Sequence, residues 1–165
     1  MMNIWLNPLI LVTFFPLAGL ALIALMNGRR AARVRWIALV TSLITFGLAI
    51  WMLVLQQGGT ELDLNRPWLR MGSTAVAFHL GADGLSLLMV LLTTFLMPLA
   101  ILSTWKSVAD EKVKGFMLFF LLLEVGMNGV FLALDLVLFY VFWEFTLIPM
   151  YFLIGMYGGE RRIYA

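Results

Sequence analysis

Five stretches of the chain are almost free of charged residues, and each is long enough to cross a lipid bilayer as a helix. A membrane-spanning helix needs about 20 consecutive apolar residues, and none of these stretches contains more than one acidic or basic residue. Hydrophobic side chains cover every face of each stretch, whereas barrel strands would alternate, so the pattern predicts helices embedded in lipid. The stretches are residues 9–26, 36–55, 85–105, 115–134 and 136–159.

Composition supports a membrane fold and argues against several other classes of protein. Hydrophobic residues make up 63% of the chain and charged residues only 12%, which is about half the charged share of a soluble domain. Cysteine is absent and His79 is the only histidine, so the sequence offers no thiolate or multi-histidine metal site. We predict an all-α membrane protein with a single transmembrane domain over residues 1–165 that binds no metal, no cofactor and no nucleic acid.

The basic residues indicate how the predicted spans are oriented. Nine of the eleven lie after the first, third or fifth span, and only Arg66 and Arg70 lie elsewhere. Positively charged loops tend to stay in the cytoplasm. We therefore predict an amino terminus outside, cytoplasmic loops at 27–35 and 106–114 and a cytoplasmic carboxyl tail.

The connection between the second and third spans, residues 56–84, has the pattern of two short strands. Leu62 and Leu64 alternate with polar residues, and Val76 and Phe78 begin a second alternating run. We therefore predict a short β-hairpin-like loop on the outer side of an otherwise helical fold.

Two glutamates stand alone inside predicted spans. Glu124 lies eleven residues before Asp135, where the fourth and fifth spans meet with almost no loop, and Glu144 lies nine residues after it. At about 1.5 Å per residue, both carboxyls lie roughly 14–17 Å from that turn, near the middle of a hydrocarbon core about 30 Å thick. A charge there costs at least about 2.5–3.5 kcal/mol, so each carboxyl must face protein or water, or take up a proton. The pair predicts a proton-translocation site.

Each glutamate has a polar residue one helical turn away, and a proline follows Glu144. Asn128 follows Glu124 by one helical turn, and Tyr140 precedes Glu144 by one turn. Pro149 has no amide hydrogen, so a backbone carbonyl beside Glu144 loses its helical partner. We predict that Asn128, Tyr140 and Pro149 support the two glutamates. The alternative is a non-transporting membrane scaffold, in which the carboxyls only hold helices together.

The region around Glu144 resembles a known family. Residues 134–155 read LDLVLFYVFWEFTLIPMYFLIG, and YGGERR follows at 157–162. This region strongly resembles the subunit M family of bacterial proton-pumping NADH:quinone oxidoreductase, respiratory complex I, whose mitochondrial members are subunit 4 of NADH dehydrogenase. Residues 78–86, FHLGADGLS, also look like that family's approach to its third helix.

The resemblance implies a proton-translocating subunit of the membrane arm, beside the antiporter-like L and N subunits. It also implies that flavin, iron–sulfur clusters and quinone are held in other subunits, and that this chain has no catalytic site of its own. Glu144 matches the family's fifth-helix glutamate, which pairs with a lysine on a later helix. Glu124 occupies a fourth-helix carboxylate position found in many members.

Two further expectations follow from the resemblance. Family members continue well beyond the fifth helix, so we expect this chain to be an amino-terminal fragment of an antiporter-like fold, truncated relative to the family. Subunits of cation/proton antiporters and of membrane-bound hydrogenases share the wider superfamily fold, and they form the alternative functional interpretation.

Overall fold

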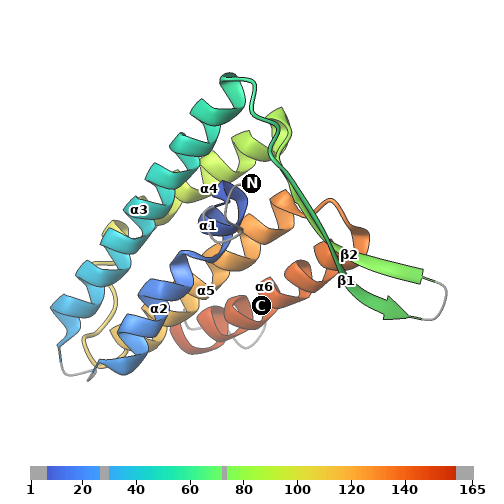
Figure 1. Ribbon diagram of the computed structural model, residues 1–165. Coiled ribbons are helices and arrows are strands. Elements are labelled where there is room, and N and C mark those ends of the chain that lie inside the picture. The colour runs from blue at the N-terminus through green and yellow to red at the C-terminus, as the bar shows by residue number, and fades with distance from the viewer. Residues whose placement is uncertain (1–6, 27–29, 72–73, 159–165) are drawn as a thin grey trace.

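The computed structural model describes residues 7–26, 30–71 and 74–158, which form a bundle of helices with one small sheet (Figure 1). Five helical segments are long and apolar enough to cross a membrane, which confirms the predicted all-α membrane fold. A two-stranded hairpin between the second and third spans is also confirmed. In chain order the elements are α1 (Pro8–Phe14), α2 (Pro16–Leu25), α3 (Ala31–Gln57), β1 (Asp63–Met71), β2 (Thr74–Gly81), α4 (Gly84–Ser103), α5 (Val113–Leu132) and α6 (Leu136–Tyr157).

The helix boundaries differ most from the predicted spans at the start of α3. This helix begins at Ala31 instead of residue 36, and it includes Arg33 and Arg35. Arginine is unfavourable in lipid but is among the better helix-forming residues. The arginines therefore mark where the membrane-embedded part begins, but the helix itself starts before them.

The first span is broken into two helices, a feature that the sequence analysis did not predict. The side chain of Asn7 accepts a hydrogen bond from the amide of Leu9 and caps α1. The helix stops at Phe14, and Pro16 opens α2 where a missing amide hydrogen costs least. Because Pro16 has no amide hydrogen, the carbonyl of Val12 loses the donor that an unbroken helix would provide.

Helix α5 lies at the centre of the bundle. It packs against α1, α2, α3, α4 and α6, whereas α6 lies at the edge, against α5 and β2. A side chain at Gly126 would collide with Thr146, and one at Gly129 would collide with the ring of Phe142, so the glycines allow α5 and α6 to approach closely. Asp135 caps α6 by accepting hydrogen bonds from two backbone amides at its start. The fourth and fifth spans thus meet with almost no loop, as the sequence indicated, and pack closely against each other.

Two basic residues connect loops to helices at the end of the bundle predicted to be cytoplasmic. Arg35 is buried, forms an ion pair with Asp110 at 2.9 Å and donates a hydrogen bond to the carbonyl of Val108. Lys114 donates to two carbonyls at the end of α2, at 2.9 and 2.7 Å. Residues predicted only to orient the chain therefore also hold its helices together.

The hairpin rests its base on the turn between α5 and α6. Its strands pair antiparallel, with an irregularity between Pro67 and Leu69. The amide of Leu134 donates to the carbonyl of His79 at 2.9 Å, which fastens β2 to that turn. The far end of the hairpin extends beyond the helices (Figure 1).

Two apolar clusters fill the bundle, and a layer of buried polar side chains separates them. One cluster, at the hairpin end, contains Val12 and Met52, and the other, at the opposite end, contains Ile23 and Val34. Between the clusters, α1, α3, α4 and α5 each carry at least one buried hydroxyl, amide or carboxyl group. We call these residues the polar layer: Thr13, Thr41, Ser42, Thr45, Thr93, Thr94, Glu124 and Asn128.

Candidate functional site

The two predicted site glutamates lie on neighbouring helices, Glu124 on α5 and Glu144 on α6. The close approaches of Gly126 to Thr146 and of Gly129 to Phe142 set the register of the helix pair. In that register Glu124 lies about three to four residues, or roughly 5 Å along the helix axis, from the level of Glu144. The similar depth inferred from the spacing therefore agrees with the packing.

The structure does not direct the two carboxyls toward each other. The residues of α6 that approach α5 include Phe142 and Thr146. Each is two positions from Glu144, which corresponds to about 200° around a helix. Glu144 therefore projects from the side of α6 that faces away from α5, and it is exposed in this chain.

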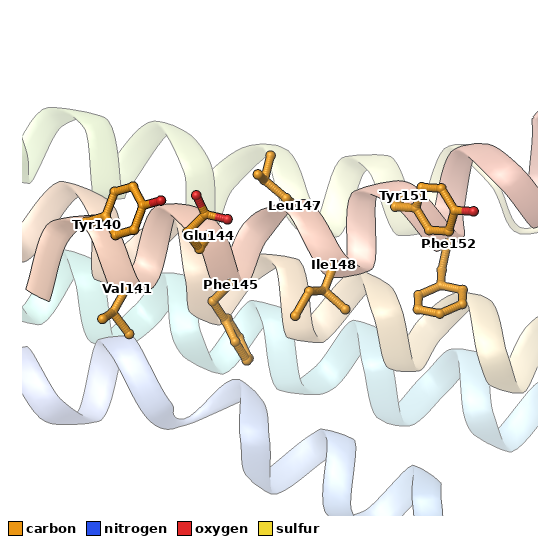
Figure 2. A pocket seen from close by; sticks show the side chains of 8 residues that line it. All are labelled: Tyr140, Val141, Glu144, Phe145, Leu147, Ile148, Tyr151 and Phe152. Atoms are coloured by element: carbon orange, nitrogen blue, oxygen red, sulfur yellow. The ribbon is translucent and has the colours of Figure 1, made fainter. Parts of the chain in front are cut away.

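Glu144 lines an open groove of about 620 Å³ along the outer face of α6. Figure 2 shows the hydroxyl of Tyr140 directed toward the Glu144 carboxyl, with Tyr151 two turns further along the helix. Tyr140 therefore lies beside Glu144, and its supporting role stays a prediction. Apart from these three groups the lining is hydrophobic: Val141, Phe145, Leu147, Ile148 and Phe152.

Glu124 has the opposite environment. Its side chain is completely buried, and neither carboxyl oxygen has a hydrogen-bond partner among the residues that the structure describes. Burial of a polar group without a partner is costly, and burial of an unpaired charge costs much more. Glu124 is therefore a carboxyl that its own chain encloses without satisfying it.

Asn128 contacts a different element from the one expected. The sequence placed it beside Glu124 as a local partner, but its Nδ2 donates to the carbonyl of Val12 at 3.2 Å. That carbonyl is the one left free by Pro16, so Asn128 repairs the break between α1 and α2. The Oδ1 atom of Asn128 is buried and has no partner in the described part of the chain.

Pro149 is buried within α6, which continues through it. The polar layer, by contrast, was missed by sequence reasoning. The hydroxyls of Thr13, Ser42, Thr45 and Thr94 donate to carbonyls of their own helices. The available signal was positional: the short polar residues of the second and third spans lie about as far from the outer ends of their spans as Glu124 does from the outer end of its own.

Comparison with known proteins places the chain among respiratory membrane subunits. Residues 133–165 match the family model described as NADH:quinone oxidoreductase/Mrp antiporter, TM. The chain is 45% identical to NADH-quinone oxidoreductase subunit M of Rhodobacter capsulatus, over 96% of this chain and 31% of that protein. It is 42% identical to the same subunit of Escherichia coli K12, over 79% of this chain and 28% of that protein.

A solved structure has a similar fold. A chain in the membrane-bound sulfane sulfur reductase, an archaeal respiratory membrane complex, superposes with a TM-score of 0.68 at 25% sequence identity. The match covers 90% of this chain and 23% of that one. The present chain thus spans about a third or less of the length of the relatives it matches.

Proposed function

The chain belongs to the subunit M family of NADH-quinone oxidoreductases, and on that premise we propose that it contributes to a proton-translocating membrane-arm subunit. The oxidoreductase would transfer electrons from NADH to quinone in other subunits, which hold the flavin and iron–sulfur clusters. This chain would contribute to the coupled transport of protons across the membrane. Its proposed partners are the antiporter-like L and N subunits.

One observation carries the proposal: a carboxyl, Glu144, is displayed on the open face of a membrane-spanning helix. A charged side chain at that depth is not stable against lipid, so protein or water must cover the face that displays it. The relatives are about three times longer than this chain. We propose that a basic side chain from the remaining part of the subunit faces Glu144, and that Tyr140 helps to orient the carboxyl.

Charge distribution supports the proposed orientation in a bacterial inner membrane. Arg35, in the first turns of α3, and Lys114, at the start of α5, lie at one end of the bundle, and the hairpin lies at the other. Under the positive-inside rule, the end with Arg35 and Lys114 faces the cytoplasm and the hairpin faces outward.

The decisive experiment replaces Glu144 by Gln in the full-length subunit, assembled in its complex. Gln keeps the size and hydrogen-bonding capacity of the side chain but cannot release a proton. We expect normal assembly together with a loss of proton uptake in membrane vesicles and a fall in the coupled quinone reduction. Glu144→Asp should retain part of the activity. Glu124→Gln should lower proton uptake less than Glu144→Gln does.

A matched control is Tyr151→Phe, which removes a hydroxyl from the same groove and leaves the carboxyl in place. We expect it to pump protons like the wild type. Normal pumping by the assembled Glu144→Gln complex would overturn the proton-transport role and favour the scaffold interpretation, because amides satisfy packing as well as carboxyls do.

A subunit of a cation/proton antiporter remains the second candidate, since the matching family model covers both kinds of protein. The two functions differ in what drives transport. In this second case, Glu144→Gln would abolish cation-driven proton exchange in vesicles that receive no NADH, and no NADH-dependent quinone reduction would accompany the subunit.

A further inference from the structure

Three oxygen atoms in the polar layer are buried without a donor. They are the two carboxyl oxygens of Glu124 and the Oδ1 of Asn128. Both side chains are 0% exposed, and they stand one turn apart on the same face of α5, where residues four positions apart are neighbours. Three unsatisfied acceptors therefore lie close together in the middle of the bundle.

The orientation of the Asn128 amide is fixed by the break between α1 and α2. A backbone carbonyl can only accept, so the carbonyl of Val12 requires the Nδ2 group on its side of the amide. The Oδ1 atom must then point away from α1. A flip of the amide would leave two acceptors in contact, so Pro16 indirectly determines which atom Asn128 offers to the interior.

The neighbouring hydroxyls of the polar layer do not supply the missing donors. Those of Thr13, Ser42, Thr45 and Thr94 donate to carbonyls within their own helices, at distances between 2.7 and 3.0 Å. A proton on Glu124 would provide one donor and still leave other acceptors unmatched. The hydroxyls of Thr41 and Thr93 make no hydrogen bond to these atoms either, so the described part of the chain provides too few donors for them.

Complete burial also restricts what can enter from outside. Glu144 is exposed, so a side chain from the rest of the subunit can reach it. Glu124 and Asn128 are already enclosed by the described helices, so no added helix can reach them without displacing one already present. The missing donor must be small. Buried water has the required size and commonly makes about three hydrogen bonds to otherwise unsatisfied polar groups.

We propose that Glu124 and Asn128 form an internal binding site for water, at the level where Pro16 breaks the first span. The water donates to the Oδ1 of Asn128 and to a carboxyl oxygen of Glu124. Asn128 is a positioning residue, because its Nδ2 bond to α1 holds Oδ1 toward the water. The effect on proton transfer rests on the proposed function, whereas occupancy of the site does not.

The direct test is a structure of the assembled complex in which ordered water is resolved. We expect at least one water within about 2.7–3.2 Å of both Asn128 Oδ1 and a Glu124 oxygen. Direct contact between Glu124 and Asn128 with no water between them would overturn the proposal. So would another side chain bonded to Glu124.

A pair of substitutions at Asn128 tests the site in the same complex. Asn128→Leu keeps the bulk of the side chain but makes it apolar, whereas Asn128→Ala leaves polar space that additional water can fill. If Asn128 only packs, Leu should be tolerated better than Ala, because Ala leaves a cavity. If it positions water, Ala should retain several-fold more proton pumping than Leu, and the order for thermal stability should be the reverse.

Failure of this proposal and failure of the proposed function give different results. Pumping at the wild-type level by Glu124→Gln would remove Glu124 from the transport path, while ordered water in the wild-type structure would still establish the site. A dry wild-type site would reject the water site even if Glu144→Gln had abolished pumping. Equal pumping by Asn128→Leu and Asn128→Ala, after correction for assembly, would reject the positioning role.

Discussion

At the scale of single residues, Asp135 joins the hairpin to the start of α6. Its carboxylate accepts hydrogen bonds from the amides of Leu138 and Val137, and from that of Ala77 in β2 at 3.4 Å. These bonds, that from Leu138 above all, hold the pKa of Asp135 below its ordinary value of 3.8, and His79 lowers it further. Partial desolvation opposes the shift without reversing it.

We expect the contact between the hairpin and α6 to loosen in acid. A carboxyl whose pKa is lowered by folding contributes stability above its unfolded pKa, and that contribution is lost as the pH falls through the folded value. Amide exchange at Ala77, corrected for the intrinsic rate, should therefore accelerate below pH 3.8. Asp135→Asn still caps the helix but does not titrate, so it should abolish this pH dependence. An unchanged dependence in that variant would assign the effect to another group.

The two membrane glutamates show what could and could not be predicted for single residues. Their similar depth followed from counting residues to Asp135, because the rise of a helix is fixed. Their opposite environments did not follow, because α6 is apolar on all sides and its sequence does not indicate which side packs. The hydrogen bond that Asn128 donates could not be predicted either, since the carbonyl that accepts it lies in α1, far away in the sequence.

At the scale of elements, the contact between α5 and α6 depends on glycine. A Cβ at Gly129 would collide with the ring of Phe142, which is itself buried in the contact. We expect Gly129→Ala to destabilise the folded protein by about 1–3 kcal/mol, because the helices must move apart or Phe142 must leave its rotamer. Thermal unfolding of the purified full-length subunit, in detergent, measures the effect.

Gly47 in α3 supplies the control, because no atom lies within 4 Å of a Cβ added there. Gly47→Ala should stabilise the protein by up to about 1 kcal/mol through helix propensity alone. If Gly129→Ala were equally stabilising, the close approach of α5 and α6 would be wrong.

Elements were predicted well where their signal is local. The five spans and the hairpin follow from hydrophobic runs and from alternation, so their existence could be derived from the sequence. The break at Pro16 was missed, because a proline in a hydrophobic run is compatible with either a kink or a new start. The ion pair and hydrogen bond of Arg35 were missed too, because its partners Asp110 and Val108 lie in the loop after another span.

At the scale of the whole molecule, the described structure has one completed side and one open side. Around α5 the bundle is closed by α1, α2, α3 and α4, whereas α6 exposes most of its large side chains. Sequence alone could not predict this asymmetry, because all five spans are hydrophobic enough to face either lipid or protein. It becomes visible only when the packing partners of each helix are known.

We expect the rest of the full-length subunit to cover the outer face of α6. A photo-crosslinking amino acid at Tyr151 should form intramolecular cross-links to later segments of the same polypeptide. The same group at Leu92, which is exposed on α4, should react mainly with lipid. Mass spectrometry of the digested protein identifies both products. Lipid adducts at both positions would show that the open side faces the bilayer.

The central place of α5 has a consequence for how the protein is made. Ribosomes deliver the spans to the membrane in chain order, so α1, α2, α3 and α4 enter the bilayer before α5 leaves the exit tunnel. They cannot adopt their final packing at that time, because the helix that all of them contact has not been synthesised. The hydroxyls of Thr13, Thr45 and Thr94 donate to carbonyls of their own helices, so these groups are hydrogen-bonded in lipid before α5 arrives. Insertion of α5, with Glu124 and Asn128, then adds the helix that contacts all four.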